Sequence, residues 1–162
     1  MKVEKRQAVV YEEGFESGNL WHTMPGMKAV ADKLAHNGNY SLLIDGTQQG
    51  SWNYTDYDLG LSVLPGSKYK LSAWMLVESM DPKIEPYLKI GLTDAQNKWI
   101  ENHSTNIYDL AILGTWQYLE TILETTVETA GGHLAIEKGS LETQIKATIR
   151  IDDVKLELIE SP

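Results

Sequence analysis

The 162-residue chain contains no cysteine, and this absence removes a whole group of functions at once. Disulfides, thiol catalysis, zinc–thiolate centres and iron–sulfur clusters all require cysteine sulfur. A chain of this length forms one ordinary domain, or at most two very small ones. Because such a domain buries roughly 70% of its unfolded surface, one apolar core is enough to hold it together.

Positive charge is also scarce. Fourteen Lys and Arg residues stand against 23 Asp and Glu residues, which gives a net charge of −9. Nucleic acids and anionic membranes attract proteins with basic patches, so we expect neither as a partner. No apolar run approaches the ~20 residues that a membrane-spanning helix needs. The segment Met1–Val10 is charged and has no apolar stretch of the kind found in signal peptides.

Helical patterns are few. Only Met27–Ala35 has a suitable composition, and it fits either one short helix or a strand followed by a loop. Most other segments alternate between apolar and polar residues and end at Gly, Pro, Asn or Asp, which is typical of strands in a sandwich or barrel. The predicted strands are Gln7–Tyr11, Tyr40–Asp45, Tyr54–Val63, Lys68–Glu78, Tyr87–Thr93, Gln117–Thr126, His133–Glu137 and Gln144–Leu158.

The last of these strands contains a change of phase. Its apolar residues occupy odd positions up to Ile151 and even positions from Val154 onward. A continuous strand cannot change its inward face, so the sequence predicts a β-bulge at Asp152–Asp153. A bulge that turns a carboxylate beside neighbouring backbone is a plausible ion site.

Catalytic motifs are missing. The sequence has no HExxH, GxSxG, GxxxxGK[ST] or GxGxxG pattern, and its four histidines are scattered. We therefore expect no catalytic residues and a protein that is not an enzyme.

The aromatic residues that are present favour binding. The chain has five Trp and eight Tyr but only one Phe, and Trp and Tyr combine a flat apolar ring with a polar edge. Alternation predicts that Trp52 and Tyr54 project outward, as does Glu137, and Trp99 falls in an expected loop after Tyr87–Thr93. Sugars stack on such rings while carboxylates accept their hydroxyls, although Trp residues also pack in cores. Trp74 fits either position, and Trp116 fits a structural role at a strand entrance.

A second group of residues suits calcium, which prefers six to eight hard oxygens from carboxylates and backbone carbonyls. Glu16 lies in Gly14–Gly18, and two aspartates lie in Ile151–Val154. The segment His36–Leu42 could lie between them. On chemistry alone, these acids are equally compatible with a solvated surface.

The order of these segments resembles the carbohydrate-binding modules of the family 4, 9, 16 and 22 group, from about Val9 to Leu158. The matching landmarks are GFESG (14–18), Trp21, HNGNYSLL (36–43), Trp52, LPGSKY (64–69), LSAW (71–74), GTWQYLE (114–120) and IDDV (151–154). The resemblance implies an all-β fold, a two-sheet antiparallel β-sandwich of the jelly-roll type. Residues 8–159 would form this module, with 1–7 as an N-terminal extension and 160–162 as the start of a linker.

The resemblance also implies site residues. Structural calcium would be held by side-chain oxygens of Glu16 and Asp152, with Asp153 as the alternative, and by the carbonyls of Gly14 and Asn39. In the cleft, Trp52 and Trp99 match stacking positions and Glu137 matches an acidic position. Xylan-binding relatives carry an aromatic where this chain has Ala135, and no Arg lies near Trp21. We add Trp21, Tyr54, Gln96 and Asn102 as further carbohydrate-binding residues from their own chemistry.

The expected function is non-catalytic binding of a β-linked plant cell-wall polysaccharide (β-glucan, xylan or mannan) in an aromatic-lined cleft. The module would be a monomer within a larger secreted, extracellular protein and would hold the catalytic domain of a parent glycoside hydrolase on its substrate. The alternatives are a structural or protein-binding jelly-roll module of a surface protein, and a small jelly-roll glycanase or lyase.

Overall fold

The computed structural model describes residues 8–48, 53–54, 63–138 and 143–161, and in this part the chain forms two antiparallel sheets. One sheet has six strands in the order β3-β4-β11-β6-β9, with β1 paired to β11. These strands are β1 (Ala8–Glu13), β3 (Met27–Asp32), β4 (Ser41–Gln48), β6 (Lys68–Asp81), β9 (Gln117–Glu124) and β11 (Ile145–Glu160).

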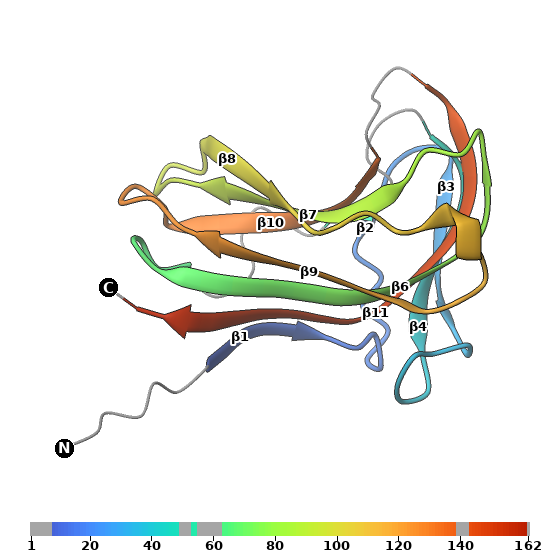
Figure 1. Cartoon of the computed structure of the whole chain (residues 1–162), viewed down its shortest axis with the longest axis horizontal. Coiled ribbons are helices and arrows are strands. Elements are labelled where there is room, and N and C mark those ends of the chain that lie inside the picture. Colours follow the sequence, from blue (N-terminus) through green and yellow to red (C-terminus); the bar gives the residue numbers. More distant parts are fainter. Residues whose placement is uncertain (1–7, 49–52, 55–62, 139–142, 162) are drawn as a thin grey trace.

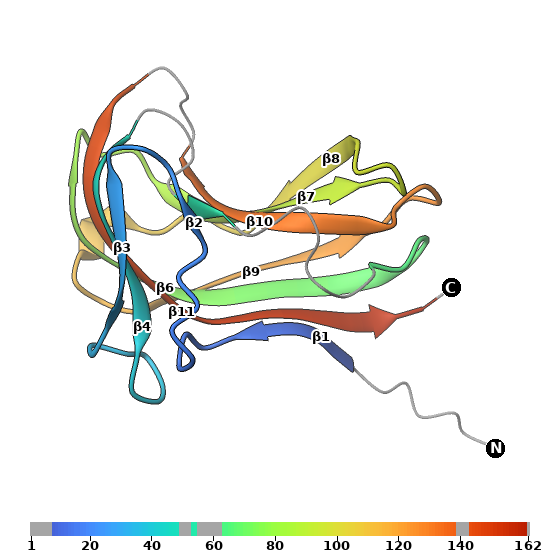
Figure 2. The same cartoon turned by 180° about the vertical axis from the view of Figure 1, so that it is seen from behind.

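The second sheet has five strands in the order β2-β5-β10-β7-β8. They are β2 (His22–Thr23), β5 (Asn53–Tyr54), β7 (Pro86–Thr93), β8 (Trp99–Ser104) and β10 (Gly131–Lys138), and a short 3₁₀ helix, η1, spans Leu110–Ile112. Figures 1 and 2 show β7, β8 and β10 stacked as one layer over β6, β9 and β11. This arrangement confirms the predicted all-β, two-sheet antiparallel sandwich of the jelly-roll type.

The core lies between the sheets and follows the alternation read from the sequence. In β6, Tyr69, Leu71, Ala73, Met75 and Val77 are all fully buried. Across the sandwich, the alternate residues of β7 and β10 are buried in the same way; they are Leu88, Ile90, Leu92, Leu134 and Ile136. Residues between these positions point away from the core, because successive side chains of a strand point to opposite faces. Each sheet therefore has one apolar face and one outer face that is open to other roles.

The predicted bulge in β11 is confirmed. The pairing of β11 with β6 shifts between Asp152 and Lys155, and Asp153 has a left-handed φ of 49°. Ile151 before the bulge and Val154 after it are both fully buried. The bulge therefore lets one long strand keep an apolar face toward the core although its sequence changes phase.

Two assignments differ from the sequence prediction. Met27–Asp32 is strand β3 followed by a loop, so the helix alternative for Met27–Ala35 is wrong, because each residue of the strand pairs with β4. Trp99 does not lie in a loop but begins the edge strand β8, which pairs with β7. Of the predicted strand Tyr54–Val63, residues 55–62 lie outside the described residues. No helix in the described ranges is long and apolar enough to cross a membrane.

The β3–β4 pairing depends on Gly46. This residue has a φ of 143°, and a Cβ atom there would collide with the Gly26 carbonyl oxygen and lie 2.9 Å from Met27 Cα. Both obstacles are backbone atoms, so neither can move aside as a flexible side chain would. The two strands can approach this closely only because residue 46 has no side chain.

We predict that Gly46→Ala lowers the melting temperature by more than Gly114→Ala does. Gly114 also has a positive φ, of 76°, but a Cβ atom there meets nothing within 4 Å. Both variants incur the cost of about 1–2 kcal/mol for a left-handed residue, and only Gly46→Ala adds the backbone collision. Thermal unfolding followed by circular dichroism measures the difference, and equal losses in the two variants would contradict this account.

Candidate functional site

The outer face of the five-stranded sheet carries a cluster of polar and aromatic side chains. In the register of β10 with β7, Glu137 pairs with Tyr87, Ala135 with Lys89, and His133 with Gly91. In the register of β7 with β8, Gly91 pairs with Asn102 and Thr93 with Trp99. Paired residues of antiparallel strands share a face. We call this surface the polar face and define it by Tyr87, Lys89, Trp99, Asn102, His133 and Glu137.

An ion pair lies at the centre of the polar face. Lys89 Nζ lies 2.7 Å from Glu137 Oε1, and their side chains are only 19% and 6% exposed. Charged groups this shielded lose hydration, so they remain only where they are paired or functional. Burial raises the pKa of Tyr87, and the negative charge of Glu137 raises it further. The pair presents a fixed donor and a fixed acceptor on the outer side of the sheet.

His133 lies flat against the sheet because its partner is a glycine. A Cβ atom on Gly91 would lie 2.5 Å from the His133 ring carbon Cε1. Burial lowers the pKa of His133; the charge of Lys89 lowers it further, and the charge of Glu137 opposes them. The lowered pKa favours the neutral ring at pH 7, in which one nitrogen donates and the other accepts.

Trp99 supplies the exposed ring of the polar face. Its side chain is 63% exposed, and its indole Nε1 donates a hydrogen bond of 2.8 Å to Asn102 Oδ1. This bond fixes one edge of the ring while leaving the ring surface accessible. Trp99, Asn102 and Glu137, three of the predicted carbohydrate-binding residues, thus lie on one face of the sheet.

The other predicted carbohydrate-binding residues have different surroundings. Trp21 is half-buried: its ring packs edge-on against Phe15, with centroids 5.5 Å apart, and its Nε1 donates to the Tyr11 hydroxyl. Gln96 is exposed in the turn between β7 and β8. Tyr54 occupies a position of β5 in register with Ala135, which itself pairs with Lys89 of the polar face. Trp52 falls outside the described residues, so its stacking role stays a prediction.

Three residues of the polar face, Tyr87, Lys89 and His133, are not among the site residues predicted from the sequence. Alternation alone indicated that His133 and Glu137 share a face. It could not indicate that Lys89, 48 positions earlier, forms the ion pair. The cross-strand register of β7 with β10 supplies this contact.

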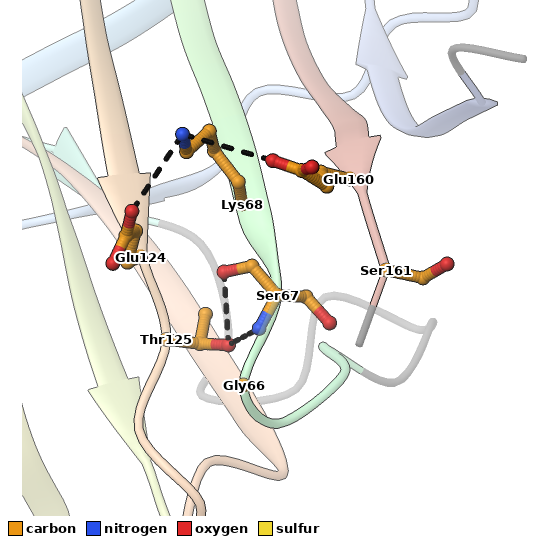
Figure 3. A pocket seen from close by; sticks show the side chains of 7 residues that line it. All are labelled: Gly66, Ser67, Lys68, Glu124, Thr125, Glu160 and Ser161. Carbon is orange, nitrogen blue, oxygen red and sulfur yellow. Dashed lines mark hydrogen bonds and ion pairs between the residues drawn. The ribbon is translucent and has the colours of Figure 1, made fainter. Parts of the chain in front are cut away.

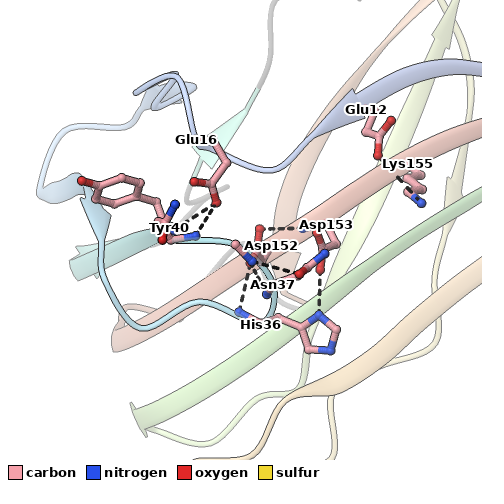
Figure 4. Close-up of polar contacts among 10 residues, drawn as sticks. Glu12, Glu16, His36, Asn37, Tyr40, Asp152, Asp153 and Lys155 are labelled. Atoms are coloured by element: carbon pink, nitrogen blue, oxygen red, sulfur yellow. Dashed lines mark hydrogen bonds and ion pairs between the residues drawn. The ribbon is translucent and has the colours of Figure 1, made fainter.

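Two of the predicted calcium ligands, Glu16 and Asp152, lie at the loop between β3 and β4 (Figure 4). Glu16 Oε1 accepts hydrogen bonds from the backbone N–H groups of Asn39 (2.9 Å) and Tyr40 (3.1 Å). Fully buried Asp152 accepts from the N–H groups of His36 and Asn37 through Oδ2 and of Asp153 through Oδ1. Two carboxylates from distant parts of the chain therefore hold the same loop.

These residues fit a hard cation in part. Glu16 Oε2 receives no hydrogen bond from the described residues. Burial raises the pKa of Asp152, and a nearby positive charge would lower this pKa again. Asp153, the alternative ligand, instead forms a 2.7 Å hydrogen bond with Nδ1 of His36. The described part of the chain holds no group of three or more His, Asp or Glu side chains suited to a metal. Any ion here would therefore rely on backbone carbonyls, such as those of Gly14 and Asn39.

A separate hollow of about 270 Å³ lies at the far end of the six-stranded sheet (Figure 3). There Lys68 Nζ lies 3.6 Å from Glu124 and 3.7 Å from Glu160, and Thr125 Oγ1 accepts a hydrogen bond from Ser67 N. The lysine charge is balanced by two acids, and none of the described residues that line the hollow is aromatic. The contacts tie the ends of β6, β9 and β11 together, which is a structural role.

Comparison with known proteins identifies relatives of this fold. A family model described as carbohydrate binding domain matches residues 7–148. The structure is similar to the CBM22-1 xylan-binding domain of Paenibacillus barcinonensis Xyn10C, with 16% identity and a TM-score of 0.69 over 99% of this chain and 100% of that one. No curated protein matches the sequence.

Two further solved structures are similar. One is the CBM22-1–GH10 part of Clostridium thermocellum endo-1,4-beta-D-xylanase 10B, complexed with xylohexaose, with 16% identity and a TM-score of 0.70 over 92% of this chain and 28% of that one. The other is a family 16 carbohydrate binding module, with 15% identity and a TM-score of 0.55 over 88% of this chain and 92% of that one. At these identities, the structural likeness establishes the fold.

We predict that the pKa of His133 responds in opposite directions to its two charged neighbours. Glu137→Gln removes the negative charge and lowers the His133 pKa, whereas Lys89→Met removes the positive charge and raises it. A ¹H NMR titration of the histidine Cε1 protons measures both midpoints, with His133→Gln to assign the resonance. Lys70→Met, on the other sheet, is the control and should leave the midpoint unchanged. A midpoint unmoved in both polar-face variants would show that the ring does not contact the pair.

Proposed function

The chain belongs to the carbohydrate binding domain family whose model matches residues 7–148, and from this premise we propose that its polar face binds a β-linked plant cell-wall polysaccharide. Membership supports the expectation of a binding module rather than an enzyme. The substrate range, the residues that contact the sugar, and the role in targeting an enzyme are parts of the proposal.

The observation that carries this proposal is that the shielded Lys89–Glu137 pair and the exposed Trp99 lie on the same face of one sheet. A sugar ring has apolar C–H faces that stack on flat aromatic rings and hydroxyls that both donate and accept hydrogen bonds. Trp99 offers the ring. Glu137 accepts, Lys89 donates and His133 does either, so the polar face matches both parts of a chain of pyranose units.

Charge narrows the class of polysaccharide. The chain carries a net charge of −9, and the lysine of the polar face is already neutralised by Glu137. A polyanion such as pectate would be repelled, so neutral glucans, xylans and mannans are the proposed ligands. Ala135 pairs with Lys89 on the same face and offers no second ring there. The proposal therefore does not single out xylan, although two of the similar structures are described as xylan-binding.

The proposed context is a larger extracellular protein. The similar Clostridium thermocellum structure joins its CBM22-1 module to a GH10 module in one chain. By analogy, this module would keep a catalytic glycoside hydrolase domain close to insoluble substrate. The resulting increase in the effective concentration of substrate at the catalytic domain depends on the length of the linker.

We further propose a structural calcium ion at the loop between β3 and β4. Glu16 Oε2, an oxygen of Asp152, and the carbonyls of Gly14 and Asn39 are the ligands proposed. Calcium there would neutralise two carboxylates and connect the N-terminal and C-terminal parts of the chain to one loop. Support comes from the convergence of Glu16 and Asp152 on residues 36–40.

We predict that Trp99→Ala weakens binding to the preferred soluble polysaccharide by roughly 30-fold, which corresponds to about 2 kcal/mol for a central aromatic contact. Glu137→Gln keeps the shape of the side chain but removes the charge, and it should weaken binding to a similar extent. Trp52→Ala, measured in the same experiment, tests the predicted stacking role of Trp52. Affinity electrophoresis against β-glucan, xylan, glucomannan and pectate, followed by calorimetry, measures the loss.

Ile112→Ala is the matched control because this side chain is 52% exposed and lies in η1, outside the polar face. Wild type and Ile112→Ala should bind alike and should not be retarded by pectate. Full binding by both Trp99→Ala and Glu137→Gln would overturn the assignment of the polar face. Absence of binding to every neutral polysaccharide would favour a protein-binding or structural module.

We also predict that a chelator lowers the melting temperature of wild type but not of Glu16→Gln. The glutamine retains an oxygen for the N–H groups of Asn39 and Tyr40, so the loop keeps its hydrogen bonds while the charge for calcium is lost. Calcium at 100 times its dissociation constant adds about 2.7 kcal/mol to the free energy of unfolding. Differential scanning calorimetry with EGTA and with restored CaCl₂ measures the change. An equal response in both proteins would exclude Glu16 as a ligand.

A further inference from the structure

A groove of about 330 Å³ lies on the outer face of the six-stranded sheet. We call it the outer groove and define it by Lys70, Ser72, Trp74, Tyr118, Asp153 and Lys155, which come from β6, β9 and β11. Its volume falls within the range of small-molecule sites. The core separates the two sheets, so the outer groove and the polar face point in opposite directions.

The register of the sheet builds the depression. Ser72 is 5% exposed and pairs with Lys155 of β11 on one side and Glu120 of β9 on the other. Along its own strand it lies between Lys70 and Trp74, which share its face. A small residue therefore occupies the floor while longer side chains surround it. The hollow is thus a property of the strand pairing, which is rigid, rather than of a loop.

An aromatic row forms one wall. Trp74 and Tyr118 are paired residues of β6 and β9, and their rings lie 5.3 Å apart at 51°. On its other side, Trp74 stacks on His36 at 4.0 Å and 14°, and His36 is held by Asp153. The orientation of Trp74 is therefore fixed in advance, which lowers the entropic cost of binding. The half-buried indole of Trp74 lines the groove, and its Nε1 forms no hydrogen bond with any described residue.

The charged groups of the groove are of both signs and nearly cancel. Two lysines and three carboxylates line it: Lys70, Lys155, Glu12, Asp153 and Glu157. Lys70 lies 3.4 Å from Glu120 and 5.7 Å from the centre of the Tyr118 ring, and Lys155 lies 3.8 Å from Glu12. Such a surface offers many donors and acceptors but little net field. It is suited to a neutral ligand rich in hydroxyls and poorly suited to a phosphate or a polyanion.

We propose that the outer groove is a second carbohydrate site, which binds a short stretch of a neutral β-linked polysaccharide along Tyr118 and the exposed edge of Trp74. Lys70, Lys155 and Asp153 contact the hydroxyls, and the Trp74 N–H donates to one of them. The module then has two sites on opposite faces and can bridge neighbouring chains of a cell wall. Bridging raises the apparent affinity for insoluble material above that of either site.

The test is a ¹H–¹⁵N NMR titration of the full chain with xylohexaose, cellohexaose and mannohexaose. The amides of Ser72, Tyr118 and Lys155 and the indole N–H of Trp74 report on the groove, and the amides of Lys89 and Gly91 report on the polar face. In wild type, both groups of signals should shift and saturate with the same hexasaccharide, each with its own dissociation constant.

Tyr118→Ala is the groove variant because this ring is 38% exposed, so its removal leaves the core intact. It should weaken the response of the groove signals at least 10-fold and leave the polar-face signals unchanged. Ile122→Ala is the matched control: the side chain is 60% exposed on the same face of β9 but does not line the groove, and it should behave as wild type.

The outcomes separate this inference from the proposed function. Shifts confined to the polar face, or groove shifts that survive in Tyr118→Ala, overturn the second site. Groove shifts without polar-face shifts support the second site and overturn the assignment of the polar face. Saturation of neither group at millimolar hexasaccharide overturns both.

Discussion

The bulge in β11 is the constraint on which the two layers and the loop at their edge depend. Strand β11 pairs with β4 before the bulge and with β1 after it, while β6 runs along its other side. Without the extra residue, either Ile151 or Val154 would face water. The same distortion buries Asp152 with three backbone N–H partners and directs Asp153 to His36. One local irregularity thus preserves the core and fixes the loop of residues 36–40.

How much of this fold the sequence predicts depends on where each strand lies in its sheet. Long central strands such as β6 and β11 have one buried face, so their alternation is strong and even the bulge could be predicted. β8 is an edge strand with half-exposed or exposed residues throughout, and its residues Trp99–Ser104 carry no such alternation. β3 forms because β4 provides hydrogen-bond partners, an interaction between distant residues that outweighs local preference.

The candidate site was predictable to a similar degree. Alternation was enough to place Glu137 on an outer face, because the period of a strand is independent of its neighbours. The partner Lys89 follows only from the register of β7 with β10, which single-strand patterns do not contain. Trp99 was predicted for its chemistry and lies on the same face through the pairing of β8. The sequence did not decide whether Trp74 is buried or exposed, because this depends on which sheet contains β6 and on what covers that sheet. Trp74 lies in the outer groove, on the sheet opposite to the one that carries Glu137.

The separation of the polar face from the outer groove has a physical consequence for a module of this size. A sandwich has two outer faces, and its core residues point inward from both sheets, so side chains on one outer face change without disturbing the other. The polar face consists of the Lys89–Glu137 ion pair with His133 nearby, packed over Gly91. The outer groove instead has Ser72 at its floor and the rings of Trp74 and Tyr118 along one wall. These are different solutions to the same requirement, namely an apolar surface beside fixed hydrogen-bonding groups. Because no residue contributes to both, the two proposed sites can differ in ligand preference, and together they would hold two polysaccharide chains in fixed relative orientation.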